Sequence, residues 1–255
     1  MLSIDQYAYS NKLKSVHPVE KFALSLLTLT MCLVSKSWLL HFIVIAFMSF
    51  LIIFAAQIPK KSYLKLMLVP FAFLSVGVLG IAVTVTKEGG MINHGFQMGN
   101  WIIGLTQQGM DQAMETFFRA YASVSCLYFL TLTTPMIDII WILKRMKVPA
   151  ILIEMMTLVY RFIFVLLETA SMMYLSQECR LGYSSIRKSY HSLGQLISNL
   201  FVKSLHRSEE LVIALSARGY KGDLDVLEEE YAYSIKNMTS IFILEIFLVG
   251  LAILV

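Results

Sequence analysis

Two long tracts without Asp, Glu, Lys or Arg, residues 22–35 and 37–59, are separated in this sequence by a single lysine, Lys36. Wound as one helix, the two tracts would measure about 55 Å at 1.5 Å per residue. The hydrocarbon core of a bilayer is only about 30 Å thick, and about 20 apolar residues cross it. The two tracts are therefore predicted to be separate membrane spans joined by a turn at Lys36.

Three further apolar tracts follow, at residues 66–86, 120–137 and 237–255. Charged residues make up 15% of the chain and hydrophobic residues 57%, whereas a soluble domain carries about 25% charge. We therefore expect an all-α polytopic membrane protein with about five transmembrane helices. The span at 22–35 is the shortest, and a re-entrant segment is the alternative for it.

The basic residues of the short loops indicate the orientation of the chain. Lys12, Lys14 and Lys21 precede the first span, and Lys60, Lys61 and Lys65 lie between the second and third. The loops of the opposite side contain only Lys36 and Lys87. By the positive-inside rule, we expect a multi-pass protein of the cell inner (plasma) membrane with a cytoplasmic N-terminus.

Between the fourth and fifth spans, apolar residues persist while charges of both signs return. The pattern predicts a short amphipathic helix at 135–147, a long helix at 150–180 that Gly182 ends, and another at 185–218. The helix at 150–180 is long enough to cross a bilayer. We expect it not to, because Glu154, Arg161 and Glu168 recur every seven residues and so share one face.

Both long helices end in an arginine followed by glycine: Arg180 with Gly182, and Ala217 and Arg218 with Gly219. A glycine stop and a cation at the negative end of the helix dipole are ordinary capping features, the cation contributing about 0.3–1 kcal/mol. The repetition on consecutive helices favours a second interpretation. A planar guanidinium on a rigid helix end suits docking into a carboxylate-lined groove of a partner protein.

With these features in place, the sequence resembles the transmembrane T component of energy-coupling factor (ECF) transporters, and within that group the cobalt-type CbiQ family. The matching segments cover nearly the whole chain: DQYAYSN at 5–11, HPVEK at 17–21, LTTP at 132–135, VP at 148–149, TLVYRF at 157–162 and ARGY at 217–220. The first arginine motif departs from the family pattern, since Cys179 stands where Ala is expected and Leu181 where a small residue is expected.

The resemblance implies a coupling subunit without catalytic activity. In that family each motif arginine docks on one of two ABC-type ATPase subunits, which bind ATP and Mg; here the residues are Arg180 with Gly182, and residues 217–219. A separate CbiM-like S component holds the substrate, with a small accessory membrane subunit as a further partner. The implied cargo is cobalt, with nickel as the alternative. Membrane lipid is the other partner, and the basic residues lack the aromatic interleaving of a nucleic-acid groove.

The expected organisation is a membrane region at 1–134, a cytoplasmic coupling domain of long amphipathic helices at 135–233 and a final transmembrane helix at 234–255. Two other functions remain open: a T component for vitamin-binding partners, and an independent permease. A permease needs polar substrate groups within its spans, where the sequence offers only Glu245 and His41.

The remaining candidate residues are intramembrane polar groups. Glu115 and Arg119 are one turn apart and are predicted to pair. Glu245 lies near the middle of the last span, so it should be protonated, paired or directed into a polar interior, with Arg119 and Arg161 as candidate partners. His41 is expected at the membrane interface. No phosphate-binding loop and no metal-ligand spacing of histidines is found, so we expect no cofactor in this chain.

Overall fold

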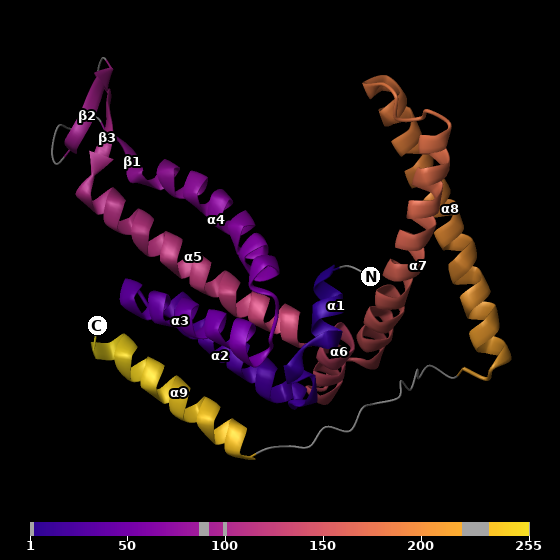
Figure 1. Ribbon diagram of the computed structural model, residues 1–255, viewed down its shortest axis with the longest axis horizontal. Helices are drawn as coiled ribbons and strands as arrows, with labels where there is room; N and C mark the ends of the chain where they lie inside the picture. Colours follow the sequence, from indigo (N-terminus) through magenta and orange to yellow (C-terminus); the bar gives the residue numbers. More distant parts are fainter. Residues whose placement is uncertain (1–2, 87–91, 99–100, 221–234, 255) are drawn as a thin grey trace. The chain divides into compact units, whose positions relative to one another are not determined.

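The computed structural model describes residues 3–86, 92–98, 101–220 and 235–254 (Figure 1). Its contacts divide the chain into two compact units, Leu2–Ile139 with Glu230–Val255, and Ile140–Glu229. We call them the membrane unit and the hairpin unit. The predicted all-α class is confirmed, with three short strands as the exception among the described residues.

The membrane unit contains all five predicted spans. Its elements are α1 (Ser3–Ser10), the short helix η1 (Lys12–Ser15), α2 (Pro18–Val34), α3 (Trp38–Phe50) continued by the π-helical turn η2 (Leu51–Ala55), α4 (Lys60–Ala82), α5 (Gln107–Thr133) and α9 (Ile235–Leu254). Helix α6 (Met136–Arg145) follows α5. The hairpin unit consists mainly of α7 (Ala150–Cys179) and α8 (Ile186–Ala217).

The predicted turn at Lys36 is confirmed. Helix α2 ends at Val34, and α3 begins at Trp38 with Ser37 as its N-cap, whose hydroxyl accepts the Leu40 N–H at 3.5 Å. Pro18 occupies the first turn of α2, where a missing N–H is tolerated, and the His17 ring accepts the Val19 N–H at 3.2 Å. Local capping interactions therefore mark both the start of α2 and the break between α2 and α3.

The third predicted span corresponds to α4, but the helix lies earlier in the sequence than predicted, because it begins at Lys60 and the chain leaves it at Ala82 to form a sheet. Strands β1 (Val83–Thr86), β2 (Ile92–Met98) and β3 (Trp101–Thr106) pair antiparallel in the order β1-β3-β2. The run VTVT at 83–86 alternates apolar and polar β-branched residues and fits a strand as well as a span, so a hydropathy count does not separate the two.

Each of the five predicted spans contains a helix, but these helices do not all have the length and hydropathy of a membrane span. Within the described residues, three helical segments are long and apolar enough to cross a bilayer: Trp38–Ala55, Lys60–Ala82 and Ala150–Cys179. Helices α5 and α6, counted as one broken span, make a fourth. Helix α2 has only 17 residues and carries Glu20 and Lys21 in its first turn, while the apolar part of α9 is Asn237–Leu251. Helix α7, which we expected outside the bilayer, has the apolar length of a span.

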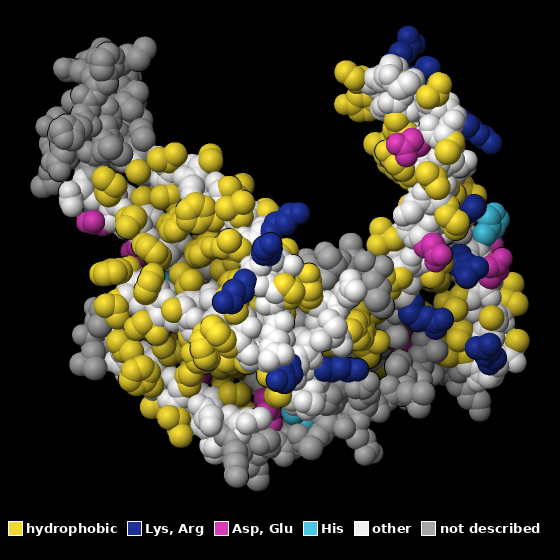
Figure 2. All heavy atoms as spheres, viewed as in Figure 1, with side chains coloured by type: hydrophobic (Ala, Val, Ile, Leu, Met, Phe, Trp, Pro, Cys, Tyr) yellow, Lys and Arg dark blue, Asp and Glu magenta, His cyan; other side chains and the backbone are white. Residues whose placement is uncertain are grey.

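Helix α5 is the centre of the membrane unit, with α1, α2, α3 and α4 packed against it. Its residues Ala122, Cys126 and Phe129 are almost fully buried, and Leu40 and Met48 of α3 join them in the core. The outer surface is apolar as well. Figure 2 shows hydrophobic side chains over the membrane unit, and Leu68 and Phe73 of α4 are 61% and 78% exposed. An apolar exterior around an apolar core is what a bilayer solvates.

The C-terminal end of α5 is held by polar side chains from the first part of the chain. The Asn11 amide donates to the carbonyl oxygens of Leu132 at 3.3 Å and Thr133 at 3.4 Å. The Lys21 ammonium donates to the Thr133 carbonyl at 3.1 Å and to the Leu13 carbonyl at 3.2 Å. The last carbonyls of a helix have no partner within it, and a cation also complements the negative end of the dipole. We call Asn11 and Lys21 the α5 clamp.

Lys21 is 3% exposed, and the negative charges of Asp138 and Glu20 attract its buried ammonium group. Its substitution by methionine should lower the free energy of unfolding by about 1–3 kcal/mol, because buried carbonyls lose their donor. Thermal unfolding of the purified chain in detergent measures this. Lys61→Met, which removes an exposed lysine at the start of α4, is the control. Equal melting temperatures for the two variants would contradict the assigned role of the clamp.

Candidate functional site: two arginine-capped helix ends

The first arginine end, residues 179–182, closes α7. Arg180 is the C-cap, with φ −92° and ψ 14°. The Leu181 N–H bonds to the Glu178 carbonyl and the Gly182 N–H to the Gln177 carbonyl, both at 2.9 Å. These two bonds form a Schellman motif, which satisfies carbonyls that the helix leaves open. Arg180 is exposed.

The second arginine end, residues 217–220, closes α8 in the same way. Arg218 is the C-cap, with φ −91° and ψ 7°. The Gly219 N–H bonds to the Ser216 carbonyl and the Tyr220 N–H to the Leu215 carbonyl, both at 3.1 Å. Gly219 has φ 75° and Arg218 is exposed. The two arginines therefore hold equivalent positions on equivalent backbone geometry.

The structure corrects the part predicted for Gly182. The residue with positive φ in the first arginine end is Leu181, at φ 60°, and this position corresponds to Gly219 in the second. An L-residue in this conformation costs about 1–2 kcal/mol. Gly182 is required for a different reason. A Cβ atom there would lie 2.7 Å from the Ser192 Oγ and 2.8 Å from the Gln177 carbonyl oxygen.

The close approach at Gly182 belongs to a network of hydrogen bonds that joins α7 to α8. The Ser192 hydroxyl donates to the Gly182 carbonyl at 2.9 Å, and the Gln177 amide donates to the Ser192 carbonyl at 3.0 Å. The Tyr183 hydroxyl donates to the Gln177 side-chain oxygen at 2.8 Å, and its ring contacts Tyr174 at 4.6 Å between centroids. The first arginine end is thus part of a tightly bonded turn.

The two arginine ends lie at opposite ends of α8. That helix has 32 residues, which corresponds to about 48 Å at 1.5 Å per residue. Figure 1 shows α7 and α8 as a pair joined by one turn. Arg180 is the C-cap of α7, next to that turn, and Arg218 is the C-cap at the other end of α8. Their separation suits contact with two different partner surfaces.

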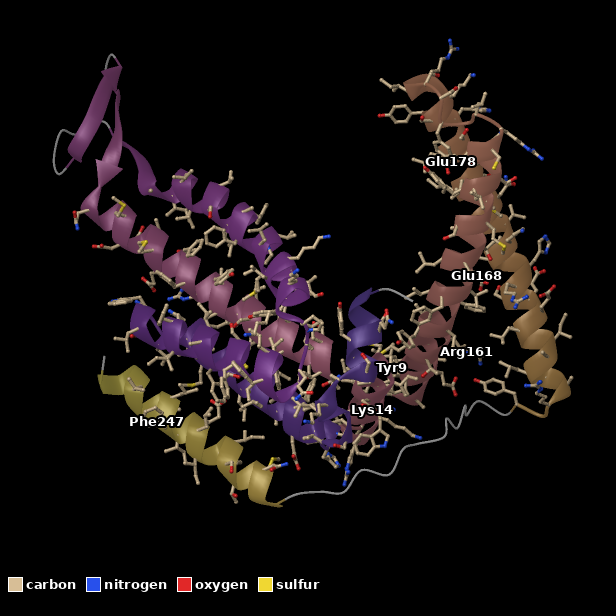
Figure 3. All side chains as sticks on the ribbon, in the orientation of Figure 1. Tyr9, Lys14, Arg161, Glu168, Glu178 and Phe247 are labelled. Carbon is tan, nitrogen blue, oxygen red and sulfur yellow. The ribbon has the colours of Figure 1, made fainter. Side chains whose placement is uncertain are left out.

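Other predicted residues of the hairpin unit are charged groups along α7. Figure 3 shows Arg161, Glu168 and Glu178 on this helix, and Arg161 and Glu168 are exposed. Because α7 is unbroken, the predicted seven-residue spacing of Glu154, Arg161 and Glu168 places them along one face.

In the membrane unit, the predicted pair of Glu115 and Arg119 is confirmed as an ion pair one turn apart on α5. Arg119 also donates to the Ser35 carbonyl at 3.3 Å, so the pair joins α5 to the turn between α2 and α3. His41 is not exposed at an interface as expected. It is fully buried, and its Nε2 lies 3.0 Å from the Cys32 carbonyl oxygen.

Glu245 of α9 is 8% exposed, and its Oε1 is buried without a hydrogen-bond partner. It has no ion pair within the described membrane unit, where Arg119, one of its two predicted partners, bonds to Glu115 and Ser35. The described residues contain no group of three or more His, Cys, Asp or Glu side chains able to hold a metal ion.

Sequence reasoning missed Asn11 and Lys21 as structural residues, although both lie in the segments that carry the family resemblance. It also missed Ser192 and Tyr183. No periodic pattern marks these residues. Each forms hydrogen bonds with a group that is distant in sequence or that only the geometry of the turn brings close.

The matched pair Gly182→Ala and Gly194→Ala tests the turn. Gly194 lies within α8 with nothing inside 4 Å of its added Cβ, so alanine there should stabilise the helix by up to about 1 kcal/mol. Alanine at Gly182 should destabilise by about 1–3 kcal/mol through overpacking. Thermal unfolding of the two variants gives the comparison. Stabilisation by both substitutions would show that the turn is loosely packed.

The chain was compared with known proteins. The pattern of the CbiQ family, described as cobalt transport protein, matches residues 10–229. The cobalt transport protein CbiQ of Salmonella typhimurium is 31% identical over 225 residues, which cover 88% of this chain and 99% of that protein. A putative fused cobalt transport protein CbiMQ of Methanocorpusculum labreanum is 25% identical over 248 residues, 97% of this chain and 41% of that one. The energy-coupling factor transporter transmembrane protein EcfT of Lactococcus lactis is 29% identical over 133 residues, 48% of this chain and 50% of the relative.

Proposed function

This chain belongs to the CbiQ family of cobalt transport proteins, and on that basis we propose that it is the transmembrane coupling subunit of an ATP-driven ECF-type importer of cobalt ions. It hydrolyses no ATP itself. Two ABC-type ATPase subunits bind ATP and Mg, and their movement passes through Arg180 and Arg218 to a separate membrane subunit that holds the substrate. The N-terminus lies in the cytoplasm, with the ATPases on that side.

One observation supports this function most directly. Arg180 and Arg218 are both exposed C-cap residues of Schellman motifs, Arg180 on α7 and Arg218 on α8. Arg180 lies next to the turn where α8 begins, so the length of α8, about 48 Å, separates the two arginine ends. Capping alone would not require an arginine at both ends, since the motif is closed by backbone bonds. A guanidinium in this position presents its planar donors outward, and carboxylates bind such donors with two parallel hydrogen bonds.

The apolar faces of α7 and α8 fit a partner membrane subunit that holds the substrate. Met155 and Met172 are 55% and 62% exposed, and Phe201 is 63% exposed. Unbranched methionine adapts to changing neighbours, so it suits an interface that slides during a transport cycle. The printed name of one relative, a fused CbiMQ protein, joins a CbiM part to the CbiQ part and so supports a CbiM-like partner. A small accessory membrane subunit is a further expected partner.

Cobalt is preferred to nickel and to vitamins as the cargo, because the matching family and a relative that the chain covers nearly completely are named for cobalt transport. An independent permease is disfavoured. The two candidate polar groups, His41 and Glu245, are both buried within the described membrane unit, and His41 Nε2 lies 3.0 Å from the Cys32 carbonyl oxygen.

Replacement of both arginines tests the coupling role. We expect Arg180→Ala with Arg218→Ala to remove the ATPase subunits during co-purification from membranes and to reduce cobalt uptake at least tenfold, since charge-assisted bonds of about 1.5–3 kcal/mol are lost at each end. Arg207→Ala is the matched control, because Arg207 is also on α8 and its ion pair with Glu210, at 3.8 Å, is exposed.

An intact complex with normal uptake in the double variant would refute the coupling role and leave the arginines as helix caps. Cobalt uptake by the purified chain alone in vesicles would instead favour a permease. Competition by nickel in the same uptake assay separates the two ions.

A variant of Glu245 tests whether transport requires an ion path through this subunit, which the proposed function does not. Glu245→Gln keeps the size of the side chain and removes its charge, so we expect unchanged assembly and cobalt uptake within about twofold of wild type. Co-purification and uptake are measured side by side. Normal assembly with abolished uptake would give Glu245 a direct part in transport.

A further inference from the structure

Packing between α7 and α8 is concentrated near their turn. Helix α7 has no buried residue, and the buried residues of α8 are Ser192 and Leu196, both in its first three turns. At the other end, the side chains are mostly exposed, including Ile151 at 63% and Ile213 at 69%. We call the end of this helical hairpin that lies away from the turn the open end. Apolar burial contributes little to holding the two helices together there.

A hydrogen bond joins the two helices at that open end. The Tyr220 hydroxyl donates to Glu154 Oε2 at 2.6 Å, across 66 positions in the sequence. Glu154 lies near the start of α7, and its second oxygen, Oε1, is buried without a hydrogen-bond partner. A phenol donating to a carboxylate is a short, charge-assisted bond, stronger than a neutral one.

The second arginine end connects this bond to Arg218. Tyr220 supplies the N–H that closes the Schellman motif on the Leu215 carbonyl at 3.1 Å, and Arg218 is the C-cap of the same motif. A contact that fixes Tyr220 thus also limits where the Arg218 side chain can point. Arg180 gets comparable support from the bonds of Gln177, Ser192 and Tyr183.

From this geometry we infer that Tyr220 and Glu154 are positioning residues: their bond holds the open end of the hairpin and so sets the direction of Arg218 toward its partner. The inference rests on the proposed coupling function. Its alternative is that Tyr220 serves only as the apolar contact that often follows a Schellman motif. Tyr220→Phe distinguishes the two, because it keeps the ring and removes the hydroxyl.

The first measurement follows the distance across the open end of the whole chain in lipid nanodiscs. Spin labels at Ile151→Cys and Ile213→Cys report on the open end, and labels at Leu175→Cys and Ile197→Cys report on the part near the turn; all four native side chains are exposed. The background carries Cys179→Ser, because Cys179 is the exposed cysteine while Cys32 and Cys126 are buried.

Tyr220→Phe should lengthen and broaden the distance distribution at the open end and leave the pair near the turn unchanged. Tyr190→Phe is the matched control, since it removes a hydroxyl from a 75% exposed tyrosine of α8. Unchanged distances at the open end in Tyr220→Phe would overturn the inference.

The second measurement uses the complete transporter in vesicles and compares cobalt uptake with ATP hydrolysis. Tyr220→Phe should lower the uptake per ATP at least about tenfold, the change that loss of a charge-assisted hydrogen bond makes in an equilibrium. Glu154→Ala should do the same, and the double variant should lose no more than either single variant. The ATPases should still co-purify, because both arginines remain.

Additive losses, or normal uptake per ATP despite a longer distance, would also overturn the inference. The coupling function is tested separately by the double arginine variant. If that variant transports normally, the proposed function fails, while the distance measurement still decides whether the bond holds the hairpin. If the arginine variant fails to transport and Tyr220→Phe behaves as wild type, the coupling function stands and the positioning role does not.

Discussion

The carbonyl groups at the C-terminal end of α5 impose the constraint on which the membrane unit depends. A helix leaves its last carbonyls unsatisfied, and an apolar surrounding offers no water to bond them. Asn11 and Lys21 supply the donors, and both come from the start of the chain. This requirement draws α1, η1 and the start of α2 against the helix around which α2, α3 and α4 pack. Burial of the Lys21 ammonium is offset by its hydrogen bonds to the carbonyl oxygens of Leu13 and Thr133.

The same demand for carbonyl partners shapes the hairpin unit, but backbone groups meet it there. Both long helices close with Schellman motifs, so Arg180 and Arg218 are not needed as donors to their own helix ends. Their side chains remain exposed for contact with other molecules. This division of roles, with the backbone closing the helix and the side chain directed outward, is the physical basis of the proposed coupling function.

Much of the fold follows from hydropathy and capping, which are local properties. The turn at Lys36, the limits of α7 and α8, and the pair of Glu115 with Arg119 were all predictable because each depends on neighbours within a few residues. Strand β1 was not, since a short apolar run fits a span as well as a strand. Leu181 occupies the position of positive φ that a glycine usually takes, whereas Gly182 is required by the close approach of Ser192, and neither fact follows from a local pattern. The bonds of Lys21 to Thr133 and of Tyr220 to Glu154 join residues too distant in sequence for any periodic pattern to reveal.

Helix α8 runs without a break from Ile186 to Ala217, and this continuity has a mechanical consequence. A regular helix has a fixed rise per residue, so the spacing between its two ends changes only if it bends or unwinds. In the proposed complex, α8 would therefore keep the distance between the two docking sites constant. Opening and closing of the ATPase pair could not lengthen or shorten the helix. The movement would have to appear as a tilt or a rotation of the whole rod, with its two ends swinging in opposite directions about a point along its axis.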